Sequence, residues 1–131
     1  MYLLDTDILV GFLRNDALAV SKMQVFLKEK GIGFISAINI HELVRGACLS
    51  KNTEKNLEKT YALIQSLNFI PFDMEGAFLS GKLSAEQEKS GRILGQNDVF
   101  IAALALQYKL VLITRNKRHF EEINGLKVEG W

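Results

Sequence analysis

Short apolar runs alternate with longer amphipathic stretches along the whole chain of 131 residues. The short runs have the length of β-strands and lie at residues 2–4, 32–35, 68–72, 110–114 and 126–128. The longer stretches have helical spacing and cover residues 8–13, 17–30, 37–49, 53–67, 75–90 and 98–108. This alternation predicts an α/β fold: a three-layer sandwich in which helices cover both faces of a central parallel sheet of about five strands.

Size and composition favour one domain. A chain with 48% apolar and 24% charged residues can bury one core and is too short for two ordinary domains, so we expect a single domain over residues 1–131. No apolar run reaches the length of a membrane span, and no secretory signal precedes the first strand. We therefore expect a cytoplasmic protein with no membrane partner.

Cysteine and histidine are too scarce for a soft-metal centre. The single cysteine, Cys48, cannot form an internal disulfide, and the two histidines complete no zinc-type spacing. The net charge of +1 also excludes an overall basic footprint for nucleic acid. Any nucleic-acid contact must then come from a local patch, and the densest one is Arg115, Lys117 and Arg118. A solvated loop is the alternative interpretation of this patch.

The first apolar run stops on two carboxylates, Asp5 and Asp7. Residues just past the carboxyl ends of parallel strands face the crevice where ligands bind in open α/β sheets. Carboxylates that converge in such a crevice need a cation to be tolerated. Each also has a structural alternative, an Asx-turn for Asp5 and the N-cap of a helix beginning at Ile8 for Asp7. Asp5 is the better site candidate.

Glu42 lies in a stretch whose apolar residues share one helical face, namely Ile40, Leu43, Val44, Ala47 and Cys48. It points away from that stripe, so the periodicity predicts a solvent-exposed glutamate.

Asp98 and Asn116 begin or follow other elements. Asp98 opens a stretch that is apolar nearly all round and therefore a helix buried on most sides, where either Asn97 or Asp98 could cap the helix. The positive end of the helix dipole is expected to keep Asp98 ionised. Asn116 follows the run at 110–114, at the crevice end, where a turn asparagine is the alternative.

These positions together resemble a PIN domain, and more narrowly the VapC-type toxin ribonucleases of bacteria and archaea. The similarity is carried by Leu4-Asp5-Thr6-Asp7-Ile8-Leu9, by Ser36-Ala37 with His41-Glu42-Leu43, by Asn97-Asp98-Val99-Phe100-Ile101-Ala102-Ala103, and by Leu112-Ile113-Thr114-Arg115-Asn116 with His119-Phe120. These motifs occur in the order and spacing of the family over essentially the whole chain.

The resemblance implies an acidic pocket that binds Mg²⁺ or Mn²⁺, with Asp5, Glu42 and Asp98 as the three core acids, catalytic and metal-binding. Many members carry a fourth acid where this chain has Asn116, and a neutral oxygen there argues against a second fully occupied metal site. We infer that Asp7 partly restores the missing charge. Thr6 and Thr114 are expected to orient ligand carboxylates or water.

The implied activity is endonucleolytic hydrolysis of RNA phosphodiester bonds, with Arg115, Lys117 and Arg118 neutralising flanking phosphates. The implied partners are an RNA substrate, a VapB-like antitoxin and a second copy in a homodimer. The amphipathic helices over 37–49 and 53–67 are the expected contact surface.

Two alternatives to this function stay open at this point, and two others are disfavoured. A housekeeping PIN-type nuclease in RNA maturation, with no antitoxin, shares every motif. A catalytically silent PIN module is kept open by Asn116. A phosphoacceptor module built on Asp5, Asp7, Asp73 and Thr114 leaves Glu42 without a role and lacks a lysine-proline step after the last strand. A dinucleotide-binding domain is disfavoured because no glycine-rich turn follows the first strand.

Overall fold

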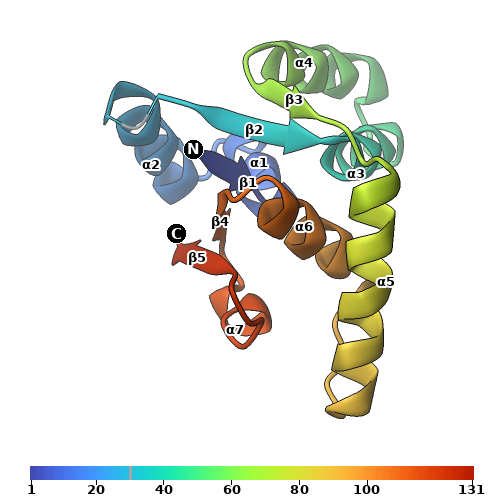
Figure 1. Cartoon of the computed structure of the whole chain (residues 1–131). Coiled ribbons are helices and arrows are strands. Elements are labelled where there is room, and N and C mark those ends of the chain that lie inside the picture. The colour runs from blue at the N-terminus through green and yellow to red at the C-terminus, as the bar shows by residue number, and fades with distance from the viewer. Residues whose placement is uncertain (30) are drawn as a thin grey trace.

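A parallel sheet of five strands forms the centre of the computed structural model, which describes residues 1–29 and 31–131 (Figure 1). The strands are β1 (Tyr2–Leu4), β2 (Gly33–Ser36), β3 (Asn68–Ile70), β4 (Val111–Thr114) and β5 (Lys127–Gly130). Their order across the sheet is β3-β2-β1-β4-β5, and every neighbouring pair is parallel. The expected α/β fold with a five-stranded parallel sheet is confirmed.

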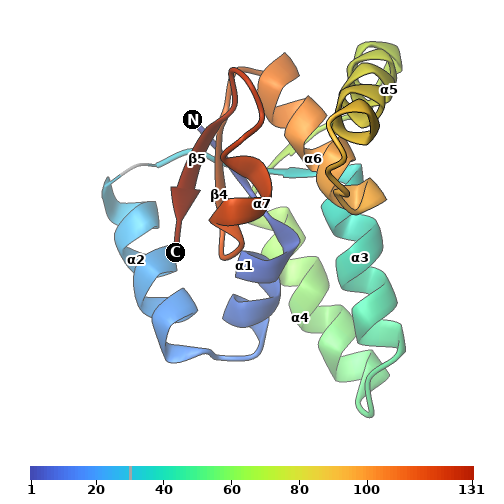
Figure 2. The ribbon, with the colours of Figure 1, turned by 90° about the horizontal axis from the view of Figure 1, so that it is seen from below.

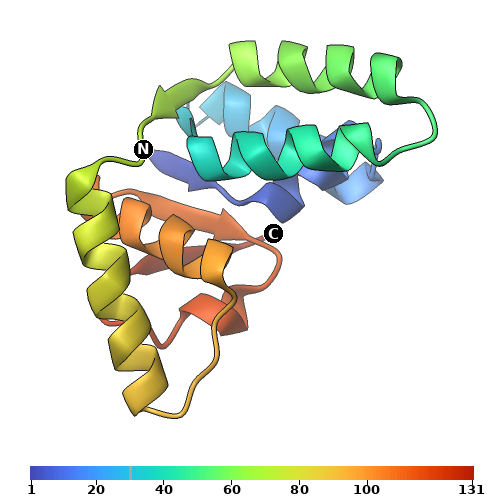
Figure 3. The ribbon, with the colours of Figure 1, turned by 90° about the vertical axis from the view of Figure 1, so that its right-hand side faces the viewer.

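The helices form two layers around this sheet. In chain order they are α1 (Thr6–Leu13), α2 (Ala17–Glu29), α3 (Ala37–Cys48), α4 (Thr53–Gln65), α5 (Met74–Lys89), α6 (Gln96–Gln107) and α7 (Lys117–Phe120). Helices α3 and α4 pack together, as do α5 and α6 (Figure 3). Lys30, the last residue of the helix expected over 17–30, lies outside the described residues.

Two apolar cores lie on opposite faces of the sheet because successive strand residues point to opposite sides. Leu4 of β1 and Ile113 of β4 belong to a core with buried residues of α1, α2, α3 and α4, and their neighbours Leu3 and Leu112 belong to a core with those of α5, α6 and α7. Every one of these four strand residues is fully buried. The three-layer sandwich thus follows from strands that are apolar on both faces.

Helix α6 is buried on most sides, as its apolar sequence predicts. Its residues Ala102, Ala103 and Leu104 have no exposed surface, and Val99, Ile101 and Ala105 are almost as inaccessible. Few of its side chains can shift without disturbing the core. The first turn of α6 is therefore held firmly against the carboxyl edge of the sheet.

The strand order creates a switch point between β1 and β4. The chain moves from β1 through β2 to β3 toward one edge and then returns to β4 and β5 on the other side of β1. Ligands bind at such points in open α/β sheets, in the crevice outside the carboxyl ends of the strands. Asp5 directly follows β1, and Arg115 and Asn116 directly follow β4.

Several element boundaries differ from expectation. Helix α1 begins at Thr6 instead of Ile8, β3 ends at Ile70 before Pro71, and β5 extends to Gly130. The short helix α7 was not expected at all, and it lies beside β4 and β5 (Figure 2). Among the described residues, no helix combines the length and the apolar character needed to cross a membrane.

Candidate metal centre at the carboxyl edge of the sheet

Asp5 is the most buried acid of the site, with 7% of its surface exposed. It is the N-cap of α1, so the structural alternative that gave this role to Asp7 is wrong. Its Oδ1 accepts the Thr6 N–H at 2.7 Å, and its Oδ2 accepts the Thr114 hydroxyl at 2.7 Å. Burial, followed by the charges of Asp7 and Asp98, raises the pKa of Asp5 to about 7. Asp5 is thus held in a position that disfavours its own charge.

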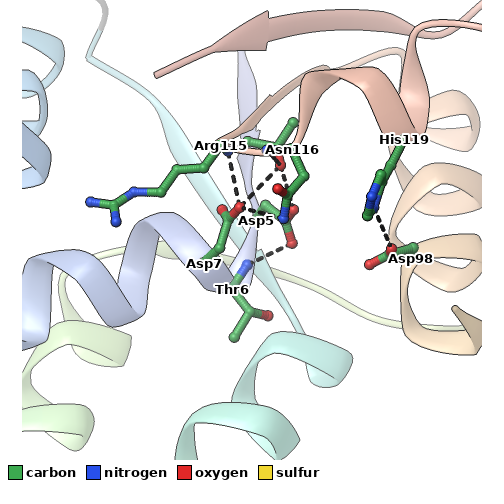
Figure 4. A network of polar contacts seen from close by, with 8 residues as sticks. Asp5, Thr6, Asp7, Asp98, Arg115, Asn116 and His119 are labelled. Atoms are coloured by element: carbon green, nitrogen blue, oxygen red, sulfur yellow. Dashed lines mark hydrogen bonds and ion pairs between the residues drawn. The ribbon is translucent and has the colours of Figure 1, made fainter.

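Asp7 lies in the first turn of α1 and faces the loop after β4 (Figure 4). Its Oδ2 accepts the Arg115 N–H at 3.0 Å and the Asn116 Nδ2 at 3.4 Å, and it lies 3.3 Å from the Thr114 hydroxyl. Its Oδ1 is buried and has no hydrogen-bond partner among the described residues. Burial raises the pKa of Asp7, while the N–H groups of Arg115 and Ile8 oppose that shift.

Glu42 is half-buried, so the prediction that it is solvent-exposed is wrong. The Thr6 hydroxyl donates to its Oε2, and the Asn97 Nδ2 donates to its Oε1 at 2.7 Å. These donors come from the first turns of α1 and α6. Helical periodicity within α3 could not reveal that two other helices cover this side of it.

Asp98 lies in the first turn of α6, beside His119 (Figure 4). Its pKa is raised by burial and by the charge of Glu42, against a lowering effect of His119, whose Nδ1 lies 3.5 Å from Asp98 Oδ2. Burial thus opposes the effect that was expected of the helix dipole at this position. The N-cap of α6 is Gly95, with no side-chain cap, so neither Asn97 nor Asp98 caps this helix.

One buried residue that the sequence analysis missed, Asn39, connects these elements. Asn39 donates from Nδ2 to the Leu4 carbonyl at 3.2 Å and to the Thr6 hydroxyl at 3.0 Å. Its Oδ1 accepts from Ser36, at 2.9 Å from the N–H and 2.7 Å from the hydroxyl. Because Asn39 donates to the Thr6 oxygen, the single Thr6 proton is directed to Glu42. The only signal in the sequence was an asparagine three residues after Ser36, which forms a capping box.

The basic residues after β4 have separate environments. Arg115 Nη2 pairs with Asp16 Oδ1 at 2.8 Å, and its side chain extends away from Asp5 (Figure 4). The three side chains are exposed, as the alternative of a solvated loop predicts; Arg115 does lie in the loop, whereas Lys117 and Arg118 belong to the short helix α7. Thr114 is fully buried, and its oxygen accepts the Asn116 N–H at 3.0 Å.

The donor set suits a hard divalent cation in kind. It consists of oxygens, its carboxylates raise one another's pKa, and it includes the unpartnered Asp7 Oδ1. Within residues 1–29 and 31–131, however, no three Asp, Glu, His or Cys side chains already lie close enough to hold one ion. Sharing an ion therefore requires the carboxylates to draw together from the positions that Thr114, Thr6 and Asn97 give them.

Comparison with known proteins gives consistent results. The PIN domain family model matches residues 2–126. Ribonuclease VapC2 of Haemophilus influenzae is 31% identical over 130 residues, which cover 99% of this chain and 97% of the relative. The tRNA(fMet)-specific endonuclease VapC of Shigella flexneri is 31% identical over 130 residues, with the same two coverages.

Solved structures agree. The crystal structure of VapBC2 from Rickettsia felis, bound to a DNA fragment from the promoter, matches with a TM-score of 0.89 and 31% identity, over 99% of this chain and 98% of that one. The expected resemblance is confirmed over almost the full length. The chain belongs to the PIN domain family and, within it, to the VapC group.

Proposed function

We propose that this chain is an endoribonuclease that depends on Mg²⁺ or Mn²⁺ and acts as the toxin of a VapBC-type toxin–antitoxin pair. Asp5, Glu42 and Asp98 are its metal ligands and catalytic residues. The names of the VapC relatives support ribonuclease activity, since one relative described above is named a ribonuclease and the other a tRNA(fMet)-specific endonuclease.

One observation carries the proposal: burial and mutual repulsion raise the pKa of Asp5 to about 7 at the switch point of the sheet. Retaining such a carboxylate destabilises the chain unless a cation offsets its charge. Asp98 and Asp7 have raised pKa values for the same first cause. A cluster with this property at a ligand-binding crevice is a functional-site signature.

A bound divalent ion would lower the pKa of a water molecule and offset charge on the phosphate oxygens. The residues of the chain position the ligands for it. Thr114 donates to Asp5, while Thr6 and Asn97 donate to the two oxygens of Glu42. Such supporting hydrogen bonds fix the orientation of ligand carboxylates.

Lys117 and Arg118 attract the flanking RNA phosphates from the exposed surface of α7, next to the site. Two or three cations give only a limited electrostatic affinity, so recognition of a particular RNA depends on other contacts.

The partners follow from the same relatives. The Rickettsia felis structure holds VapBC2, which supports a VapB-like antitoxin as the partner of this chain. Helices α3 and α4 are the proposed contact surface for the antitoxin or a second copy. Val44 of α3 and Tyr61 of α4 are apolar and exposed there, and together with Leu57 and Ile64 they line one open hollow.

Incubation of the purified chain with cellular RNA tests this proposal. Cleavage is expected with Mg²⁺ or Mn²⁺ and is expected to stop with a chelator. Asp98→Asn should abolish cleavage without loss of the fold, whereas Glu75→Gln, a matched change in the first turn of α5, should not. Metal-independent cleavage, or full activity of Asp98→Asn, would contradict it. Sequencing of RNA ends after induced expression identifies the substrate.

The housekeeping alternative is tested in cells. Induced expression should arrest growth, and co-expression of a small DNA-binding protein encoded beside this gene should relieve the arrest. Growth that continues despite active enzyme would favour the housekeeping nuclease.

A further inference from the structure

We propose that Arg115 is a positioning residue, whose side chain latches the loop after β4 to the α1–α2 corner so that its own N–H is held against Asp7. This inference rests on the proposed function, because it assigns Arg115 to the support of the metal site instead of to RNA phosphate. The proposal stands on two contacts that one residue makes with different partners, one through its side chain with Asp16 and one through its backbone with Asp7.

The side-chain contact fixes the loop to the corner. Arg115 Nη2 lies 2.8 Å from Asp16 Oδ1, and the same oxygen accepts the Ala19 N–H at 2.9 Å at the start of α2. The pKa of Asp16 is lowered by that N–H and also by Arg115. An Asp16 carboxylate that is already fixed by α2 is a better anchor than a freely rotating one.

Gly11 provides the space for this contact. A Cβ at Gly11 would lie 2.5 Å from Arg115 Nη2 and 2.9 Å from its Cζ, closer than atoms in contact can be. The guanidinium therefore packs directly on the backbone of α1, where only a glycine lets it approach. Arg115 touches both helices of the corner, through Gly11 in α1 and through Asp16 just before α2.

The backbone contact reaches the acids. The Arg115 N–H donates to Asp7 Oδ2 at 3.0 Å, and the next residue, Asn116, donates to the same oxygen at 3.4 Å. Figure 4 shows the Arg115 side chain leaving to one side, away from Asp5 and Asp7. The Arg115 charge also opposes the burial-driven rise of the Asp7 pKa, but the hydrogen bond to Asp7 comes from the backbone N–H. Moving the side chain is therefore expected to move the donors of Asp7 as well.

Calorimetric titration with Mn²⁺ tests the latch. Arg115→Ala is expected to weaken Mn²⁺ binding about tenfold, the size of effect seen when a supporting residue is removed. Gly11→Ala should have a similar effect, since the new methyl group displaces the guanidinium while α1 stays helical. Arg115→Lys should bind Mn²⁺ nearly as well as the wild type because its ammonium still pairs with Asp16.

Two further measurements separate a latch from general damage. The double variant Gly11→Ala/Arg115→Ala should be no weaker than Arg115→Ala alone, because both changes break one contact. Arg92→Ala removes a comparable surface ion pair, Arg92 with Glu122 at 3.0 Å, and should leave Mn²⁺ binding unchanged. Exchange of the residue-115 amide hydrogen should be faster in Arg115→Ala than in the wild type and should be restored in Arg115→Lys.

The measurements distinguish a failure of the latch, a failure of the proposed function and a failure of the Gly11→Ala variant to fold. If Arg115→Ala weakens RNA binding but leaves Mn²⁺ binding and amide exchange unchanged, Arg115 is a phosphate contact and the latch is overturned. If the wild type itself binds no Mn²⁺, the proposed function fails, while the amide exchange still decides for or against the latch. A Cβ at Gly11 would also lie 3.1 Å from Ala19 Cβ. If Gly11→Ala therefore fails to fold, the two Arg115 variants carry the test.

Discussion

Asp5→Asn is expected to stabilise the metal-free protein at pH 8 while it removes the metal site. The folded-state pKa of Asp5 is about 7 against an ordinary value of 3.8. Each pKa unit is about 1.4 kcal/mol, so the full difference corresponds to about 4 kcal/mol. The sign follows from the direction of the shift. The folded protein binds the Asp5 proton more tightly than the unfolded chain does. The stabilising contribution of protonated Asp5 to the free energy of unfolding is therefore fully present below pH 4 and is lost as the pH rises through about 7.

The variant keeps most contacts of the wild-type side chain. The amide oxygen of the introduced asparagine can still accept the Thr6 N–H, and its NH₂ group can donate to the Thr114 oxygen or to Asp7. What disappears is the buried charge and its repulsion with Asp7 and Asp98. Urea unfolding with a chelator, at steps from pH 4.5 to 8, should therefore show the variant gaining on the wild type by about 3 kcal/mol over this range, since the rest of the difference lies below pH 4.5.

Asp73→Asn is the matched control. Asp73 is also an N-cap aspartate, at the start of α5, but the Gly76 N–H and Gln107 lower its pKa. The contribution of Asp73 to the free energy of unfolding is present above the ordinary pKa of aspartate and is lost only as the pH falls below that value. This contribution is therefore constant between pH 5 and 8. Added Mn²⁺ should stabilise the wild type at pH 8 and leave Asp5→Asn unaffected. An equal pH dependence of wild type and Asp5→Asn would refute the reasoning.

Three other substitutions test the hydrogen bond from Thr6 to Glu42, the charge at residue 116 and the packing of the apolar core. Thr6→Val should weaken Mn²⁺ binding in calorimetry and Thr6→Ser should not, since only the hydroxyl donates to Glu42; equal affinities would dismiss this role. Asn116→Asp should strengthen Mn²⁺ binding and lower the stability of the metal-free protein, because it adds a carboxylate beside Asp7; weaker binding would remove residue 116 from the site. Phe26→Ala should cost about 3–5 kcal/mol in urea unfolding because this ring is almost fully buried, and a loss below about 1 kcal/mol would contradict its place in the core.

The fold was predictable from the sequence because its strands are apolar on both faces. Leu3 and Leu4 are adjacent and both fully buried, which only a sheet covered on two sides allows. The apolar stretch that became α6 predicted a buried helix for the same reason. The predicted start of α1, Ile8, differs from the observed start, Thr6, because either Asp5 or Asp7 could cap the helix. Local sequence does not distinguish two nearby caps.

The candidate site was predictable only as a set of acids. Asp5 could be placed from strand topology, whereas the location of Glu42 depended on the resemblance to a family, since the helical period of α3 pointed it to solvent. The partners of Glu42 come from other elements, as Asn97 lies 55 residues away along the chain. The role of Asn39 was missed for a similar reason: the capping box with Ser36 is local, but the bonds to the Leu4 carbonyl and the Thr6 hydroxyl span 35 and 33 residues of the chain.

The central claim is that Asp5, Glu42 and Asp98 bind one hard divalent ion together. Crystals grown with Mn²⁺ and measured at the manganese absorption edge test it most directly. The account predicts a single strong anomalous peak within about 2.3 Å of oxygens from all three acids, with no peak in Asp98→Asn crystals treated in the same way. A peak elsewhere on the molecule, or none at a saturating Mn²⁺ concentration, would contradict it.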